Sequence, residues 1–227
     1  MDISNWFKII TALITVILAL FAGYIELRKN PEYWLNRWFA IFFVSVALGF
    51  LFYSIYHINT LNPIIIIPMM IIAQILYNFG LVSLLMTVFI LEHSEKVAMT
   101  AKYLGIIMGL FIVSIFGYFI WVPTLNMERY RQGVVDTDTP LGWFIAVNII
   151  RIGIFIFVLY KFILIASQSE GKTKTSVLMF FIGTIIGIIG IFLNMLGGIL
   201  YSLWIEIAGL IAFDIGLIII VRGFLIE

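Results

Sequence analysis

The chain has 227 residues, of which 63% are hydrophobic and 11% charged, and its mean hydropathy is +1.18. Soluble domains carry about a quarter charged residues, so in water this chain would expose very large apolar patches. Its net charge of +1 argues against nucleic-acid binding, and the lack of cysteine excludes disulfides, thiolate metal sites and cysteine nucleophiles.

Seven apolar segments follow one another along the chain, each long enough to cross a bilayer. About 20 helical residues span about 30 Å of hydrocarbon, where only helices or closed barrels satisfy their backbone. Strands of alternating polarity are absent from the sequence. We therefore predict one domain over residues 1–227, an all-α membrane protein with a seven-transmembrane helix bundle. The predicted helices are Trp6–Leu27, Trp38–Ile58, Ile64–Leu91, Tyr103–Val122, Leu141–Ser167, Ser176–Gly198 and Leu203–Val221.

The basic residues in the connections predict the orientation of the bundle. Eight fall on one side of the predicted bilayer and three on the other; the eight are Arg28, Lys29, Arg37, Lys96, Lys102, Lys172, Lys174 and Arg222, and the three are Lys8, Arg129 and Arg131. Cytoplasmic loops retain the positive charge, so we predict the N-terminus outside and the C-terminus inside. The N-terminal residues lack the features of a cleaved signal peptide. We expect a multi-pass protein of the cell membrane, consistent with a prokaryotic source.

Arg151 and Asp214 both lie about 15 Å below the predicted outer surface, in the fifth and seventh helices. A charged side chain at the bilayer centre is costly and therefore indicates a functional site. Gln74 and Asn78 lie four residues apart on the third helix, so they share one face at a similar depth. We predict a midplane polar cluster in which Arg151 pairs with Asp214.

Further polar side chains lie above this cluster, toward the predicted outer surface. Asn148, Asn194, Tyr201 and Glu206 are expected to line an outward-facing vestibule. Two other interpretations stay open: a buried bond that fixes helix registry, or charges that snorkel separately to the surface. The candidate ligand-binding residues are Gln74, Asn78, Asn148, Arg151, Asn194, Glu206 and Asp214.

Small residues indicate close helix contacts. The sixth helix carries Gly183, Gly187 and Gly190, and the fourth carries Gly105 and Gly109. Such stripes let a neighbouring backbone approach, so we expect packing within the bundle, with a dimer face or a gating hinge as the alternative.

A weak internal repeat relates the third and seventh helices. Asn78-Phe-Gly-Leu-Val matches Asp214-Ile-Gly-Leu-Ile at an offset of 136, and Asn5-Trp-Phe resembles Gly142-Trp-Phe at an offset of 137. Two parallel three-helix repeats joined by the fourth helix would form a 3+1+3 arrangement, which some transporters use. Chance alignment of apolar segments is the alternative.

The sequence lacks the residues that several classes of enzyme and cofactor-binding protein require. No lysine lies mid-helix to bind retinal, only Asp214 lies at the depth an aspartyl protease needs, and no nucleotide-binding glycine loop occurs. The two histidines, His57 and His93, are predicted at opposite faces and do not form a metal site. We therefore expect no enzymatic activity, no cofactor and no metal.

The glycine-rich sixth helix is followed by a very short turn and by a seventh helix closing with Val221-Arg222-Gly223-Phe224-Leu225. In these features, and in the spacing of helices two to seven, the chain resembles the seven-helix N-terminal membrane sensor domain of histidine kinases. The resemblance implies a receptor that binds a small ligand from the outer side and shifts helices five to seven. Because no kinase follows Glu227 in this sequence, we expect either that signalling needs a cytoplasmic partner protein or that the chain is the membrane part of a longer protein.

Two alternative functions remain. The length, helix count and N-out topology also resemble sugar-exporting SWEET transporters, which favours a small-solute transporter or channel, although the expected hinge prolines are absent from helices one, two, five, six and seven. A scaffold or assembly subunit would act through its lipid-buried faces. The expected partners are the lipid bilayer, an unknown small ligand, a cytoplasmic signalling protein and further copies of the chain in a homo-oligomer.

Overall fold

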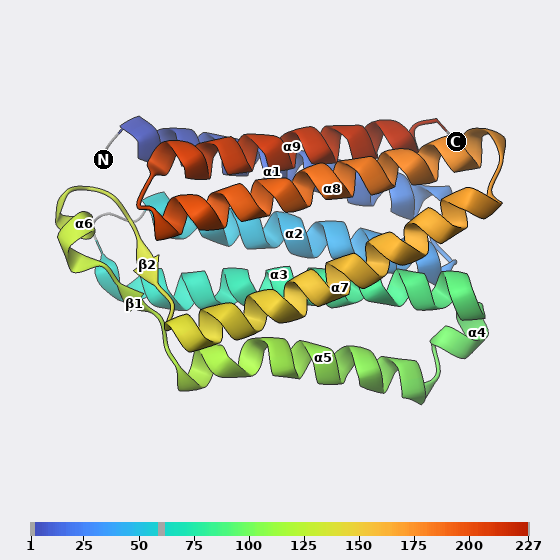
Figure 1. Ribbon diagram of the computed structural model, residues 1–227, viewed down its shortest axis with the longest axis horizontal. Helices are drawn as coiled ribbons and strands as arrows, with labels where there is room; N and C mark the ends of the chain where they lie inside the picture. The colour runs from blue at the N-terminus through green and yellow to red at the C-terminus, as the bar shows by residue number, and fades with distance from the viewer. Residues whose placement is uncertain (1–2, 59–61, 227) are drawn as a thin grey trace.

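Figure 1 shows the computed structural model, which describes residues 3–58 and 62–226. Within these ranges, seven helices are long and apolar enough to cross a membrane, and they run side by side along the long axis. They are α1 (Ile3–Lys29), α2 (Trp34–Ile58), α3 (Ile66–His93), α5 (Ala101–Ile120), α7 (Leu141–Gln168), α8 (Gly171–Ile199) and α9 (Leu203–Phe224). The predicted all-α seven-helix membrane fold is confirmed.

The largest difference from the predicted helix bounds is at the start of α8. This helix begins at Gly171, five residues before the predicted Ser176. Gly171 has a φ of +59°, a conformation that glycine adopts without strain, so the chain turns sharply and enters the helix at once. The prediction counted only apolar residues and therefore missed the polar first turn.

Short elements connect the long helices. They are η1 (Pro63–Ile65), α4 (Glu95–Ala98), α6 (Met127–Arg131) and two strands, β1 (Thr124–Leu125) and β2 (Thr137–Asp138). The strands pair antiparallel, with α6 between them, in the loop that precedes α7. This loop lies at the same end of the bundle as the N-terminus (Figure 1), which we call the N-terminal end; the opposite end is the C-terminal end.

Six of the long helices form a closed ring. Around this ring the neighbours are α1, α2, α3, α7, α8 and α9, and α9 packs against α1 again. The remaining long helix, α5, lies outside the ring against α3 and α7. In Figure 1, α7 runs diagonally and diverges from α8 toward the N-terminal end.

Glycines allow α8 and α9 to pack backbone to backbone. A Cβ atom at Gly183 would lie 2.5 Å from the Gly216 carbonyl oxygen, and one at Gly190 would lie 2.5 Å from that of Gly209. The predicted packing role is therefore confirmed for the sixth helix. It is wrong for Gly105 and Gly109 of α5, where an added Cβ would meet no described atom within 4 Å because this face of α5 points away from the bundle.

Five phenylalanines from four helices fill the ring toward its C-terminal end. Phe162 and Phe180 have ring centroids 4.7 Å apart, and Phe39 packs edge-on against Phe180 at 5.5 Å. Phe43 and Phe224 complete the cluster at 5.7 Å from each other. We call Phe39, Phe43, Phe162, Phe180 and Phe224 the phenylalanine plug. The Phe39–Phe180 and Phe43–Phe224 pairs are edge-to-face, an arrangement that aromatic rings prefer.

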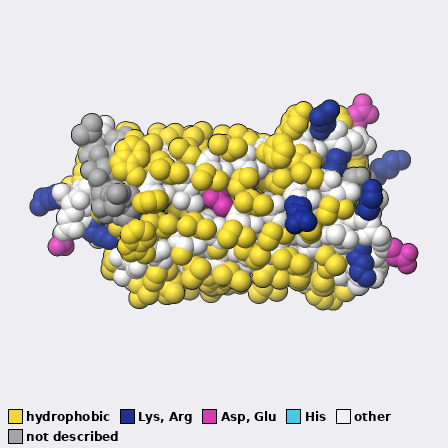
Figure 2. Space-filling model, turned by 90° about the horizontal axis from the view of Figure 1, so that it is seen from above, with side chains coloured by type: hydrophobic (Ala, Val, Ile, Leu, Met, Phe, Trp, Pro, Cys, Tyr) yellow, Lys and Arg dark blue, Asp and Glu magenta, His cyan; other side chains and the backbone are white. Residues whose placement is uncertain are grey.

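The surface agrees with a membrane environment. Figure 2 shows a broad band of hydrophobic side chains between two ends at which the charged side chains gather. Large apolar residues on the outside of the helices, such as Ile17, Phe119 and Ile156, are more than half exposed in the isolated chain. Such a continuous apolar band requires lipid, so this is a multi-pass membrane protein.

Candidate functional site

A cavity of about 540 Å³ lies inside the ring of helices. It extends along α8 from Ile199 to Gly183, a depth of about 24 Å at the rise of an α-helix. Its walls come mainly from α2, α3, α7, α8 and α9, with Lys8 of α1 and Tyr118 of α5 also lining it, and Val135 and Thr139 of the α6 loop lie at its mouth. The cavity therefore begins at the N-terminal end and reaches toward the phenylalanine plug.

Arg151 projects from α7 into one wall of this cavity. Its Nε donates a hydrogen bond to Asn78 Oδ1 at 2.8 Å, and its Nη2 donates to Gln74 Oε1 at 2.7 Å. Nη2 also lies 3.4 Å from the hydroxyl of Tyr118 on α5, which itself donates to Gln74 Oε1 at 3.2 Å. Asn78 in turn donates to the backbone oxygen of Ser114 at 3.1 Å. The predicted grouping of Gln74, Asn78 and Arg151 is therefore present.

The guanidinium of Arg151 has no carboxylate partner among the described residues. The ion pairs of this part of the chain include Lys8–Glu206, Glu26–Lys29, Glu92–Lys161 and Arg129–Asp136, and none of these involves Arg151. The oxygens that accept from Arg151 belong to neutral amides and a phenol. Hydrogen bonds orient this cation, but its charge faces the cavity uncompensated.

The predicted pairing of Arg151 with Asp214 is wrong. Asp214 is buried on α9 and accepts a hydrogen bond from the Thr15 hydroxyl of α1, and it does not line the cavity. Equal depth in the membrane does not bring two residues together, because the direction in which each points also depends on which helices are neighbours. Helix α9 packs between α8 and α1, whereas Arg151 of α7 faces α3.

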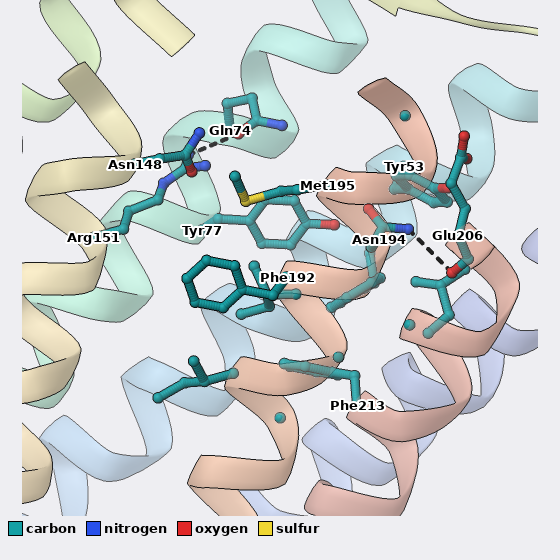
Figure 3. A pocket seen from close by; sticks show the side chains of 18 of the residues that line it. Tyr53, Gln74, Tyr77, Asn148, Arg151, Phe192, Asn194, Met195, Glu206 and Phe213 are labelled. Atoms are coloured by element: carbon teal, nitrogen blue, oxygen red, sulfur yellow. Dashed lines mark hydrogen bonds between the residues drawn. The ribbon is translucent and has the colours of Figure 1, made fainter. Parts of the chain in front are cut away.

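Glu206 lies on the opposite wall from Arg151, nearer the mouth. Its carboxylate forms an ion pair with Lys8 of α1, and the two residues are only 6% and 2% exposed. Figure 3 shows Glu206 and Asn194 on one side of the cavity and Arg151 and Gln74 on the other. Sequence reasoning missed Lys8 as a partner, although its position near the start of α1 matches that of Glu206 near the start of α9.

The remaining predicted polar residues also face the cavity. Asn194 donates to the Glu206 backbone oxygen at 3.3 Å, and Asn148 donates to the backbone of its own helix at 2.8 Å. Tyr77 extends between the two walls (Figure 3), and its buried hydroxyl has no hydrogen-bond partner among the described residues. Buried polar atoms are normally satisfied, so the Tyr77 hydroxyl calls for a partner inside the cavity.

The mouth of the cavity carries mixed charge. Arg129 of α6 binds Asp136 at 2.8 Å and lies over the ring of Tyr201 at 5.3 Å. Asp138 of β2 also faces the cavity, where partial burial and the Asp136 carboxylate raise its pKa above the ordinary value of 3.8, against the opposing effect of Arg129. Tyr201 lines the mouth as predicted.

The two mid-depth hydrogen bonds, Thr15–Asp214 and Arg151–Asn78, occupy equivalent places in the two three-helix units, α1–α3 and α7–α9. Thr15 and Arg151 are 136 positions apart, as are Asn78 and Asp214. Thr15 of α1 donates to Asp214 of α9, and Arg151 of α7 donates to Asn78 of α3. In both bonds the first helix of one unit donates to the third helix of the other. The α1–α9 and α3–α7 interfaces are thus held by corresponding bonds, which supports the repeat that the sequence predicts.

Of the seven predicted ligand-binding residues, five line the cavity: Gln74, Asn148, Arg151, Asn194 and Glu206. Asn78 is buried behind Arg151 and orients it. Among the described residues, no group of three His, Asp or Glu side chains could hold a metal ion. Comparison with protein-family models, with curated proteins and with solved structures finds no match to this chain.

Proposed function

We propose that this chain is a membrane sensor that binds a small ligand in the cavity from the outer side and signals through a partner protein. The observation that carries the proposal is a deep cavity with polar groups on two walls that ends against a packed aromatic cluster. Ligand sites are typically concave and largely apolar, with a few placed polar groups. Closure below the cavity favours a receptor over an open pore.

The phenylalanine plug offers a route from the cavity to the C-terminal end. Ile220 of α9 lines the cavity, and Phe224 lies one turn further along the same helix. Phe224 contacts Phe180 of α8 and Phe43 of α2, and the Lys29 amine lies 5.0 Å from its ring centre. A ligand that displaces α7 or α9 would therefore repack the plug and move the helix ends that face the cytoplasm.

The first test is whether a small molecule occupies the cavity. Ile188 lines the cavity, whereas the adjacent Ile189 is 50% exposed on the outside of α8 and does not. We expect native mass spectrometry of the membrane-extracted protein to show a bound small molecule that Ile188→Trp loses and Ile189→Trp keeps. Equal occupancy in both variants would contradict the proposal.

The second test follows movement at the C-terminal end. The chain has no cysteine, so cysteines introduced at Ser167 of α7 and Leu225 after α9 carry the only spin labels. We expect the distance between the labels to change when the small molecule is removed from wild type, and to stay unchanged in Ile188→Trp. An unchanged distance in wild type would contradict the proposed signalling, although the cavity would still bind a ligand.

A small-solute transporter or channel is the second candidate. It is favoured by the corresponding Thr15–Asp214 and Arg151–Asn78 bonds, because transporters built from repeats bind their solutes between the repeats near the midplane. Proteoliposomes should then carry an ion or solute flux that Ile188→Trp blocks and Ile189→Trp does not. Absence of both flux and bound molecule would instead favour the scaffold.

A further inference from the structure

We infer that the cavity binds an amphiphile with one anionic head group, placed against Arg151, and an apolar tail that extends toward the phenylalanine plug. This inference rests on the proposed ligand-binding function and names the chemical class of the ligand.

The first step is the charge of Arg151. A guanidinium carries five N–H donors, and the described hydrogen bonds use its Nε and Nη2. Their acceptors, on Asn78, Gln74 and Tyr118, fix the plane of the group without neutralising it. A carboxylate or phosphate accepts from such an oriented fork more strongly than a neutral oxygen does, so the site favours an anion.

The second step is the shape and lining of the cavity beyond Arg151. The whole cavity, about 540 Å³ over a depth of about 24 Å, is long rather than round, which suits a linear chain, and about 9 Å of that depth lies beyond Arg151. The residues that line the cavity toward the plug are almost all apolar: Phe42, Val46, Phe155, Ile188, Leu217 and Ile220. Alkyl chains gain free energy from leaving water for such a surface.

The third step is access from the bilayer. Phe192 and Ile199 of α8 line the cavity, yet they are 47% and 59% exposed. Leu141, at the start of α7, likewise lines the cavity and is exposed. The cavity therefore reaches the lipid-facing surface where α7 diverges from α8 (Figure 1). A membrane-dissolved amphiphile can enter tail first through this opening.

The fourth step is the number of charges on the head group. Asp136, Asp138 and Glu206 line the mouth of the cavity, opposed by Lys8 among the lining residues and by Arg129 beside them. These carboxylates repel a head group with several negative charges more than one with a single charge. A single anionic group at Arg151 is the best match.

The experiment compares probe molecules that share the same dodecyl-length tail and differ in the charge of the head group. The 227-residue chain in nanodiscs is titrated by calorimetry with laurate, the singly charged diester dodecyl methyl phosphate, dodecanol and dodecyltrimethylammonium, and the heat from empty nanodiscs is subtracted. We expect laurate to bind at least about tenfold more tightly than dodecanol. Tighter binding of dodecyl methyl phosphate than of laurate would assign the head to a phospholipid-like phosphate diester instead of a carboxylate, and it would support a singly charged anionic head equally.

Variants separate the head group from the tail. Arg151→Gln should weaken laurate binding at least about tenfold and leave dodecanol binding unchanged, which also shows that the variant is folded. Arg151→Lys should keep most of the preference for laurate. Asp214→Asn changes a buried charge at the same depth outside the cavity, and it should leave all four affinities unchanged.

Two results would overturn the inference. Equal affinity for laurate and dodecanol, or tightest binding of the cationic probe, would reject the anionic head while leaving a ligand-binding cavity. Failure of the proposed function would look different: no probe would bind, and Ile188→Trp and Ile189→Trp would show the same occupancy in native mass spectrometry.

Discussion

The α1–α9 and α3–α7 interfaces hold the two three-helix units together by corresponding bonds, but they differ in what surrounds them. At α1–α9, Asp214 meets Thr15 in a buried contact outside the cavity, and Lys8 and Glu206 form a buried ion pair nearer the N-terminal end. At α3–α7, Arg151 meets Asn78 at the cavity wall. We call α1–α9 the closed interface, because its Lys8 and Glu206 bind each other at the cavity mouth, and α3–α7 the open interface, because Arg151 faces the cavity without a counterion.

This difference indicates that one interface stabilises the fold and the other binds the ligand. At the closed interface Lys8 and Glu206 neutralise each other and the Asp214 carboxylate is hydrogen-bonded away from the cavity, so we expect substitutions there to change stability. The charge of the open interface is oriented by neutral groups and left without a counterion, so we expect substitutions there to change binding. Three substitutions at the two interfaces and one at the cavity mouth test this contrast.

The largest expected effect is at Lys8. Lys8→Ala leaves the Glu206 carboxylate buried without its counterion, which should lower the free energy of unfolding by about 3 kcal/mol. The measurement is SDS titration of the protein in mixed micelles. The double variant Lys8→Met with Glu206→Leu should recover most of the loss, because it removes both buried charges. An effect of Lys8→Ala below about 0.5 kcal/mol would contradict a closed interface.

The next effect is at Thr15. Thr15→Val removes the hydroxyl that donates to the Asp214 carboxylate, and we expect a loss of about 1 to 2 kcal/mol in the same titration. Thr11→Val is the matched control on α1, because the Thr11 hydroxyl bonds only to the backbone of its own helix. Equal effects of the two substitutions would show that the Thr15–Asp214 bond does not hold α1 to α9.

The seven helices were predictable because their apolar lengths and loop charges are local properties of the sequence. The partners of Arg151 and Asp214 were not, because depth along a helix is local whereas the direction a side chain faces depends on the neighbouring helices. Helix α5 lies outside the ring, so α3 and not α9 faces Arg151. The offset of 136 that relates Asn78 to Asp214 also relates Thr15 to Arg151, so either bond, once known, predicts the other.

A smaller effect on stability is expected at Arg151. Arg151→Met loses the bonds to Gln74 and Asn78, but it also removes a desolvated cation without a counterion, so the two effects partly cancel. We expect the free energy of unfolding to change by less than about 1 kcal/mol. A loss as large as that of Lys8→Ala would assign Arg151 a structural role and remove the contrast between the two interfaces.

The smallest effect is at Asp138, which borders the mouth of the cavity. Because its pKa is raised in the folded state, the folded protein favours the protonated carboxyl, and this stabilisation is lost as the pH rises from the ordinary value of 3.8 through the raised pKa. Asp138→Asn should therefore raise the melting temperature slightly at pH 7 and leave it unchanged below about pH 3. Glu128→Gln, a charge removal on exposed α6, is the control. If Asp138→Asn lowered the melting temperature at pH 7, Arg129 would be stabilising the Asp138 carboxylate, and the mouth would be closed by matched charges like the α1–α9 interface.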